Sequence, residues 1–241
     1  MANLSQLGIL ESLDGFLLVD KPAGLAFSTV VKAVKRKFNL VKVGHGGSLD
    51  AAASGLLVLM IGDSNKFTGD VMGADRAYEG RIRFGLKTNT GDVQGADIAR
   101  SGAVPTAEAL AKALPEFKGD VFEVEPRYCA VRKEGSAAYE IADTGDHTQF
   151  LAHVYRFAIE APVAGETVSP FTLRASKGVL VRALASDLGD ALGCGAALES
   201  CRRTAQGNFK VEDAIPFDKL LEVEPKDFPS LVVPPAKAPL S

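Results

Sequence analysis

Hydrophobic residues occur along the chain either in short runs, which are typical of buried strands, or at helical spacing. Residues 16–20 and 56–61 are largely apolar runs of strand length, and a turn signal with Pro or Gly follows each of them. Behind Ser28, apolar residues recur every three or four positions up to Phe38 while Lys and Arg lie between them, which predicts an amphipathic, basic helix beginning at Ser28. The same patterns predict strands over 78–84, 150–160 and 167–176, and helices over 106–114 and 180–192. In these helices Thr106 is the expected N-cap, and four leucines are in register: Leu180, Leu184, Leu188 and Leu192.

The order of these elements predicts a chain that mixes α and β structure in one large domain. No internal repeat and no convincing linker interrupts residues 1–224. From Glu224 the chain reads EPKDFPSLVVPPAKAPLS, with five prolines in eighteen residues, a composition that disfavours a helix or a central strand. We therefore expect one domain over residues 1–224 and a Pro-rich tail over residues 225–241.

Composition and charge indicate in which cellular compartment the protein works and which kinds of partner it can bind. The 241 residues carry 30 acidic and 27 basic side chains, for a net charge of -3, so a polyanion can be held only by a local basic surface. The three cysteines, Cys129, Cys194 and Cys201, lack metal-site spacing, and only three histidines accompany them, so we expect no bound metal. The apolar run at residues 16–19 is too short to span a membrane and has no cationic segment before it. These features predict a soluble, cytoplasmic protein.

One segment combines glycines with a carboxylate. Residues 44–55, GHGGSLDAAASG, contain four glycines, one His and a single Asp, Asp50. Five basic residues and no acidic one lie between Ser28 and Leu49, so Asp50 follows a stretch of positive potential that favours an ionised nucleophile or base. The glycines allow another backbone, or a planar substrate, to approach closely. An Asp in such a sequence also fits a simple turn or a helix cap, and the residues alone leave both interpretations open.

Several blocks of the sequence together resemble the TruB family of tRNA pseudouridine synthases. GFLLVDKPAG (15–24) is similar to the family's strand followed by DKPxG, and residues 44–67 are similar to its GHxGxLDxxAxGxLxxxxGxxxK block. The positions that match the second block are Gly44, His45, Gly47, Leu49, Asp50, Ala53, Gly55, Leu57, Gly62 and Lys66. The resemblance continues through residues 75–95, 125–145, 175–196 and 201–209, and it covers the chain from Gly15 to about Phe217.

This resemblance implies an α+β pseudouridine synthase fold, with a mixed, mostly antiparallel sheet, flanking helices and a central catalytic cleft. Enzymes of the family break the N-glycosidic bond of a uridine in RNA, rotate the base and rejoin it through carbon, with one essential Asp and no cofactor. Asp50 matches that Asp. Tyr78 matches the Tyr that stacks on the flipped base, His45 a residue that contacts RNA beside it, and Arg182 the Arg that pairs with the catalytic Asp. The implied substrate is a uridine in the T-loop of tRNA, and we expect a monomer that binds RNA without a metal or a membrane.

Some departures from the family pattern bear on activity. Leu180 stands where the family has Tyr, Cys201 where it has Leu, and Gly46 where it has Thr. Leu180 and Cys201 are still substrate-binding candidates, because apolar side chains can wall the base, although Leu180 donates no hydrogen bond. We also expect no PUA-type RNA-binding domain, which many relatives carry, because the 241 residues leave no room for it. An RNA-binding or RNA-folding module on the same scaffold, or a paralogue that modifies another RNA, is therefore the alternative.

Local charge supports an RNA surface in spite of the acidic total. Residues 174–210 hold six basic side chains against three acidic ones, and the helix after Ser28 adds a basic side. We expect these two regions to contact phosphates, because phosphate contacts supply most of the salt-dependent affinity for RNA.

Two short segments of the sequence partly match motifs of other enzyme classes. Residues 60–65 place Ser64 in a Gly-Asp-Ser block after an apolar strand, as in GDSL esterases, but neither His147 nor His153 has the required Asp three positions earlier. A phosphate-binding loop is disfavoured because GHGGSLD lacks the spacing of two Gly, Lys and a hydroxyl residue.

Overall fold

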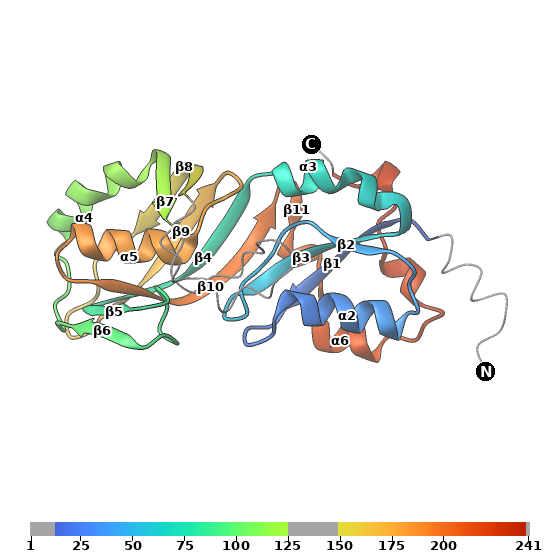
Figure 1. The fold of residues 1–241 in the computed structure, drawn as a ribbon, viewed down its shortest axis with the longest axis horizontal. Helices are drawn as coiled ribbons and strands as arrows, with labels where there is room; N and C mark the ends of the chain where they lie inside the picture. The colour runs from blue at the N-terminus through green and yellow to red at the C-terminus, as the bar shows by residue number, and fades with distance from the viewer. Residues whose placement is uncertain (1–12, 125–148, 240–241) are drawn as a thin grey trace. The chain divides into compact units, whose positions relative to one another are not determined.

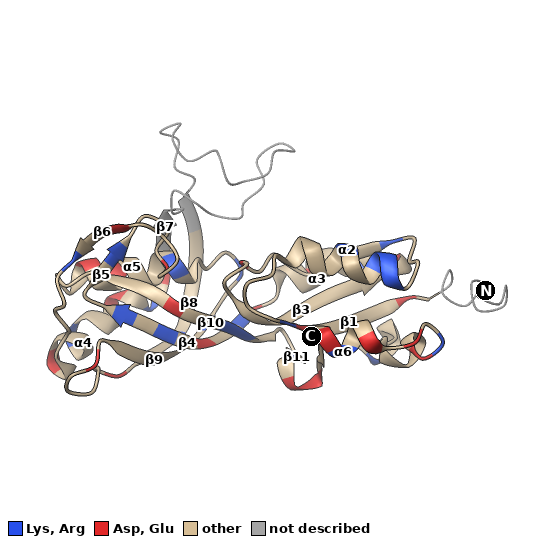
Figure 2. Ribbon diagram, turned by 90° about the horizontal axis from the view of Figure 1, so that it is seen from below, with Lys and Arg blue, Asp and Glu red and all other residues tan. Residues whose placement is uncertain are grey.

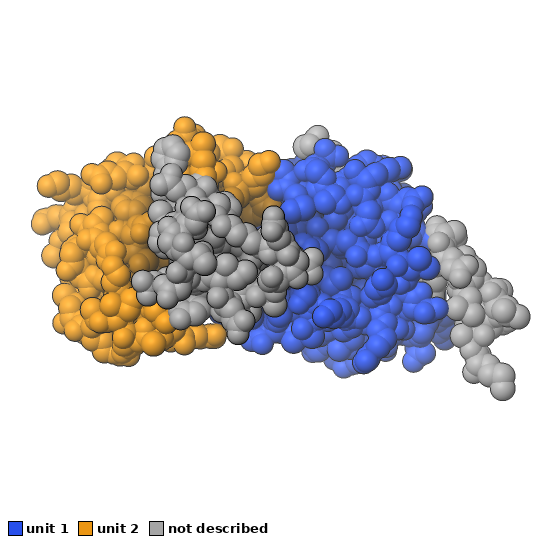
Figure 3. All heavy atoms as spheres, viewed as in Figure 1, with its two compact units in different colours: residues 1–74, 202–241 blue, residues 75–201 orange. Residues whose placement is uncertain are grey.

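The structure, a computed structural model, describes residues 13–124 and 149–239 of the chain. The chain forms two compact units, in which Met1–Ala74 with Arg202–Ser241 makes up unit 1 and Asp75–Cys201 makes up unit 2 (Figure 3). Strand β10 (Ala196–Gln206) belongs to both, since its first residues lie in unit 2 and its last residues, from Arg202, lie in unit 1 (Figure 1).

Unit 1 is built around two long antiparallel strands. Its strands are β1 (Gly15–Lys21), β2 (Val43–His45), β3 (Ser54–Ile61), β11 (Phe209–Lys210) and β12 (Ile215–Pro216). They follow the order β12-β1-β3-β10, while β2 pairs with β3 and β11 pairs with β10. β10 runs parallel to β3, with Arg202 opposite Ser54 and Arg203 opposite Gly55. This pairing brings a segment from near the C-terminus to the start of β3, directly after the glycine loop.

Helices cover both faces of β1 and β3 in unit 1. The α-helices are α2 (Phe27–Lys37), α3 (Thr68–Gly73) and α6 (Phe217–Glu222), and 3-10 helices span Gly62–Phe67, Val211–Asp213, Phe228–Leu231 and Pro235–Lys237. On one face, α2 and α6 pack through Val34 and Leu220 onto Leu17 (Figure 1). On the other face, Val71 of α3 and Phe209 of β11 belong to a second core cluster. Because both faces are buried, the strands carry continuous apolar runs rather than alternating ones.

The Pro-rich C-terminal segment packs onto unit 1. Phe228 is fully buried, and its ring stacks on that of Phe38 with a centroid distance of 3.9 Å. Val233 and Phe16 exchange two backbone hydrogen bonds of 2.8 and 2.9 Å. Full burial of one Phe side chain contributes about 1.5–3 kcal/mol, so this segment adds to the core of the unit. The expected division of the chain at residue 224 stays a prediction.

Unit 2 has a sheet that is buried on one face only. Its strands are β4 (Arg76–Phe84), β5 (Leu86–Thr88), β6 (Asp97–Arg100), β7 (Gly119–Val124), β8 (Gln149–Ile159) and β9 (Val168–Ala175), and its helices are α4 (Ala107–Ala113), α5 (Val181–Ala191) and the 3-10 helix Leu114–Phe117. The order is β10-β4-β9-β8-β7, with β5 and β6 as a separate pair. Buried and exposed side chains alternate along β9, and α5 buries Leu184 and Leu188. One covered face accounts for the alternating pattern in this part of the sequence.

The expected α+β fold with a mixed, mostly antiparallel sheet is confirmed. The expected strands form within two residues of their predicted ends, and Thr106 caps α4 by accepting a 3.1 Å hydrogen bond from the Ala109 N–H. The expected basic helix is confirmed as α2, which begins at Phe27, one residue before Ser28, and Ala26 at its N-cap makes no side-chain bond.

Within the described ranges no helix has the length and apolar content needed to cross a membrane.

Candidate active site

Asp50 lies in the loop between β2 and β3, and backbone hydrogen bonds define the course of this loop. Gly46 donates its N–H to a carbonyl of β3 over 2.8 Å, and Ala53 donates to the carbonyl of Asp50 over 3.1 Å. In the turn after β1, Gly24 donates to the carbonyl of Ala51 over 2.7 Å. The side chain of Asp50 is partly buried. The carboxylate therefore projects from a backbone that is tied on both sides to the two long strands.

Lys21, the last residue of β1, joins that strand to the loop. Its side chain is fully buried, and its ammonium donates hydrogen bonds of 2.8, 2.8 and 3.3 Å to the carbonyls of Pro22, Leu25 and Ala51. Burial lowers the pKa of Lys21 to about 8, the charge of Asp50 opposes this shift, and the charge of Arg203 adds to it. Both charges therefore act on the Lys21 ammonium, and the three side chains form a charged cluster at the loop.

Two side chains of β10 hold the loop from the other side. Arg203 is buried, and its guanidinium donates over 2.8 Å to the carbonyl of Leu56 and over 3.1 Å to that of Ser48. Gln206 is also buried, and its amide donates to the carbonyl of Gly46 and, over 2.6 Å, to that of Val71 in α3. Buried polar groups are stable only when they are hydrogen-bonded, so these contacts fix the loop firmly on β10.

Two glycines of the loop allow this close packing. A Cβ atom on Gly46 would lie 2.4 Å from Cγ1 of Val71, and one on Gly55 would lie 2.3 Å from the carbonyl oxygen of Arg203. Gly55 also has a φ of 101°, which side chains other than Gly rarely adopt. The sequence-based expectation that the glycines admit another backbone is confirmed at Gly55, where that backbone is β10.

His45 ends β2 and opens the Asp50 loop. Its ring lies 4.8 Å from that of Phe27, the first residue of α2. This contact packs the first turn of α2 against the residue that precedes the loop. His45 and Asp50 thus lie on the same short segment of unit 1.

A second Arg of β10 contacts the strand that carries Lys21. Arg202 donates two hydrogen bonds, of 2.9 and 2.7 Å, to the two carboxylate oxygens of Asp20. Because successive side chains of a strand point to opposite faces, Arg202 and Arg203 bind different partners. The paired arginines of the CRRT segment therefore anchor β10 to both β1 and the Asp50 loop.

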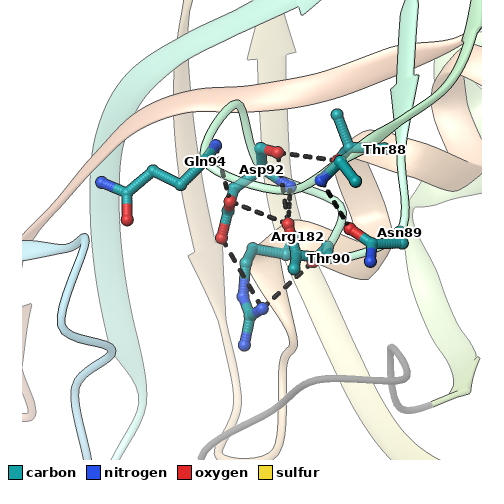
Figure 4. A network of polar contacts seen from close by, with 7 residues as sticks. Thr88, Asn89, Thr90, Asp92, Gln94 and Arg182 are labelled. Atoms are coloured by element: carbon teal, nitrogen blue, oxygen red, sulfur yellow. Dashed lines mark hydrogen bonds and ion pairs between the residues drawn. The ribbon is translucent and has the colours of Figure 1, made fainter.

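Arg182 lies in unit 2, at the beginning of α5, and a tight turn between β5 and β6 holds it. Its guanidinium donates over 3.0 Å to the carbonyl of Thr90 and lies 3.7 Å from Oδ2 of Asp92, and both charged side chains are largely buried. Oδ1 of Asp92 accepts hydrogen bonds from the Thr90 hydroxyl (2.9 Å) and the Gln94 N–H (3.0 Å), and its carbonyl accepts one from the Thr88 hydroxyl (2.7 Å) (Figure 4). Asp92 therefore orients the Arg182 side chain.

The other predicted site residues also lie in unit 2. Tyr78 is a buried residue of β4, Cys201 is a buried residue of β10, and Leu180 is the partly buried N-cap of α5. Unit 1 thus holds Asp50 and His45, and unit 2 holds Tyr78, Leu180, Arg182 and Cys201. The pairing of Arg182 with Asp50 stays a prediction, and the block at residues 125–145, with Cys129 and His147, lies outside the described residues.

Sequence reasoning missed four residues that hold the Asp50 loop or the Arg182 side chain. They are Lys21, Asp92, Arg203 and Gln206. All four lie in the sequence blocks that resemble the family, which was the available signal. Their roles were not predictable, because most of their partners come from distant parts of the chain.

The esterase interpretation finds no support in the position of Ser64. This side chain is fully buried in the 3-10 helix that follows β3. A nucleophilic serine must be reached by its substrate, and Ser64 is packed within unit 1.

Two protein families match most of the chain. The family "TruB family pseudouridylate synthase (N terminal domain)" matches residues 35–179, and "tRNA pseudouridylate synthase B C-terminal domain" matches residues 182–230. The second match extends beyond residue 224, the expected end of the catalytic domain.

Relatives named tRNA pseudouridine synthase B are similar over most of their length. The protein of Azoarcus sp. (strain BH72) is 36% identical over 94% of this chain and 80% of the relative. The protein of Burkholderia pseudomallei (strain 668) is 38% identical over 87% of this chain and 70% of the relative. The protein of Pseudomonas aeruginosa (strain UCBPP-PA14) is 36% identical over 92% of this chain and 73% of the relative.

Solved structures share the fold at lower identity. A chain of the archaeal box H/ACA sRNP Nop10-Cbf5 complex has a TM-score of 0.64 at 22% identity and covers 94% of this chain. A chain of a Cbf5-Nop10-Gar1 complex has a TM-score of 0.69 at 22% identity and covers 95%. This chain spans 57% and 62% of those two chains, and the likeness is one of fold. Together with the matches above, it establishes that the chain belongs to the TruB family of tRNA pseudouridine synthases, which are isomerases.

Proposed function

We propose that this chain converts a uridine in the T-loop of tRNA to pseudouridine, with the carboxylate of Asp50 as the catalytic group. The named relatives are tRNA pseudouridine synthases. The observation that carries the proposal is the way the Asp50 loop is held: buried Lys21, Arg203 and Gln206 bind its backbone carbonyls. A loop that served only as a turn would not need three buried polar side chains directed at it.

The reaction is an isomerisation, so all atoms of the uridine remain in the product. The N-glycosidic bond from N1 to C1′ breaks, the uracil rotates, and C5 bonds to C1′, after which C5 loses a proton and N1 carries one. An ionised Asp50 takes part either by attacking C1′ or by removing a ribose proton to give a glycal-like intermediate. Both routes need a carboxylate held at a fixed place, because correct positioning supplies much of the rate.

In this proposal the other site residues bind the flipped nucleotide. Tyr78 stacks on the uracil, Leu180 and Cys201 wall it by apolar contact, and His45 contacts the RNA next to it. Arg182, oriented by Asp92 and Thr90, pairs with Asp50 and holds its carboxylate. No cofactor takes part.

The catalytic role of Asp50 is tested by tritium release from tRNA that contains uridine labelled at C5. We expect release by the unaltered chain and a fall of at least ~100-fold in Asp50→Asn, which keeps the size of the side chain but cannot act as a base or nucleophile. Asp70→Asn, a change on an exposed residue of α3 in the same unit, is the matched control and should keep the full rate. Release at the unaltered rate by Asp50→Asn contradicts the role of Asp50.

The same experiment separates enzyme from binding module. Filter binding of tRNA measured alongside should show similar affinity for the unaltered chain and for Asp50→Asn. Tight binding of tRNA by the unaltered chain without tritium release would favour an RNA-binding or RNA-folding module.

The T-loop target is tested by chemical mapping of pseudouridine in total RNA from cells with and without this chain. We expect one T-loop uridine of tRNA to lose its modification when the chain is removed. Loss of modification only at a uridine of another RNA contradicts the T-loop target and leaves the role of Asp50 standing.

A further inference from the structure

One side of α2 carries a stripe of positive charge. Lys32, Lys35 and Arg36, which we call the basic stripe, are all exposed, and positions three and four apart in a helix lie on the same side. No acidic residue occurs in α2, and Figure 2 shows only basic and uncharged residues along it. The stripe is thus a local cationic surface on a protein whose net charge is -3.

Packing does not account for these three charges. The opposite side of α2 buries Val30 and Val34 in the core of unit 1, and that requires the stripe positions only to be polar. Gln or Glu would serve the helix equally well. Ion pairs of unit 1 join Lys42 to Asp63, Arg202 to Asp20 and Lys219 to Glu222. Among the residues that the structure describes, no carboxylate forms an ion pair with the stripe, whose side chains are exposed to solvent.

The helix that carries the stripe starts close to the Asp50 loop. Phe27, the first residue of α2, packs against His45 at a ring distance of 4.8 Å, and His45 opens the loop that carries Asp50. The stripe begins further along the helix, at Lys32, and ends at Arg36, which corresponds to about 6 Å along the helix axis. Three cationic side chains on such a surface can contact two or three neighbouring phosphates of a nucleic-acid strand.

We propose that the basic stripe of α2 binds the phosphodiester backbone of the RNA substrate, on the strand that continues from the nucleotide placed at the Asp50 loop. The proposal rests on the proposed function for the identity of the polyanion. Phosphate contacts position RNA without reading its sequence, so the stripe sets affinity and does not take part in the chemical step. A chain without a general positive field needs such a local surface to hold a polyanion.

The test compares two triple variants that remove the same charge. The first combines Lys32→Gln, Lys35→Gln and Arg36→Gln, in which Gln preserves the helix propensity of the replaced residues. The control combines Lys219→Gln, Lys226→Gln and Lys237→Gln, all at exposed positions of unit 1 outside α2 and outside residues 174–210. The dissociation constant of a tRNA transcript is measured at several NaCl concentrations, together with tritium release in a single turnover at saturating tRNA.

We expect the stripe variant to bind tRNA at least ~10-fold more weakly, with a salt dependence whose log–log slope is smaller by about 2–3, while the control stays near the unaltered chain. The single-turnover rate at saturating tRNA should stay within about twofold of the unaltered chain. The lost phosphate contacts are equally strong in the ground state and in the transition state, so their loss weakens binding but does not slow the chemical step.

Equal tRNA affinity in the stripe variant and the control overturns the proposal. Stripe-dependent binding to vesicles containing phosphatidylserine, with unchanged tRNA binding, also overturns it and indicates a membrane surface as the partner. The two proposals of this section fail separately. Stripe-dependent tRNA binding without any tritium release contradicts only the catalytic function, and full release with unchanged affinity in the stripe variant contradicts only the RNA-binding stripe.

Discussion

The loop that carries Asp50 and the turn that carries Asp92 are held by contacts of different range. Lys21, Arg203 and Gln206 bind loop carbonyls that are 30, 155 and 160 residues away in the sequence. In the Asp92 turn, Thr88, Thr90 and Gln94 bind Asp92 across four, two and two residues. The first arrangement exists only when the sheet of unit 1 has formed, whereas the second is a local turn that Asp and Thr favour wherever they occur at this spacing.

This difference predicts which substitutions disturb the Asp50 loop and which disturb the Asp92 turn. Substitutions far from Asp50 in the sequence should disturb its loop and the stability of unit 1 together, because the same buried side chains serve both. Substitutions in the Asp92 turn should alter the orientation of the Arg182 side chain with little effect on the free energy of unfolding.

The largest effect is expected for Arg203→Leu. The change leaves the buried carbonyls of Leu56 and Ser48 without their donor and should lower the free energy of unfolding by about 2–4 kcal/mol, measured by urea denaturation. Arg202→Leu, at the neighbouring position with a side chain 33% exposed, is the control and should cost at most about 1 kcal/mol. Equal costs would show that the loop does not depend on the buried arginine.

A smaller cost is expected for Gly46→Ala. The added methyl group would lie 2.4 Å from Cγ1 of Val71, and overpacking of this kind lowers the free energy of unfolding by about 1–3 kcal/mol. Combining it with Val71→Ala should recover part of the loss, and a double-mutant cycle measures this coupling. Gly69→Ala in α3, where an added Cβ meets nothing within 4 Å, is the control. A zero coupling energy would contradict the contact.

Lys21 should make stability depend on pH. Its native pKa of about 8 lies below its usual value of 10.5, so between these values the unfolded chain binds more protons and the free energy of unfolding rises with pH. The free-energy cost of burying the Lys21 ammonium lowers stability in full below pH 8, where Lys21 is charged in both the folded and the unfolded chain. It disappears above pH 10.5, where Lys21 is neutral in both. Relative to Lys21→Met, the unaltered chain should gain about 1 kcal/mol between pH 8 and about 9.5 in urea denaturation. The exposed change Lys226→Met should leave this pH dependence intact, and an equal pH dependence in Lys21→Met would contradict the assignment to Lys21.

The smallest effect on stability is expected for Asp92→Asn. Asn keeps the oxygen that accepts from Thr90 and Gln94, and Arg182 keeps its 3.0 Å hydrogen bond to the Thr90 carbonyl, so the turn should persist and the free energy of unfolding should fall by about 1 kcal/mol. The charge beside Arg182 is lost, so tritium release should fall more than tRNA binding does. Asp97→Asn, on an exposed residue of β6, should alter neither. Unfolding as severe as in Arg203→Leu would show that the turn is not held locally.

Much of the fold was predictable because it depends on neighbours in the sequence. The apolar run that forms β3 and the Thr106 cap of α4 were both expected and confirmed. The contact of Phe27 with His45 was not predictable, because it joins residues of different elements. The same holds for the C-terminal segment: its prolines indicate a lack of regular structure, but they do not show that Phe228 stacks on Phe38.

The sequence by itself determined the strand and helix pattern, the glycine loop around Asp50 and the motif blocks that relate this chain to its family. Only the tertiary structure decided that Lys21, Arg203 and Gln206 converge on that loop, and that Asp92 orients Arg182. The physical reason is the separation in sequence between the residues that interact. Periodicity, capping and turn formation are set by residues a few positions apart, whereas a buried ammonium, guanidinium or amide is stable only beside carbonyls that the folded sheet brings to it.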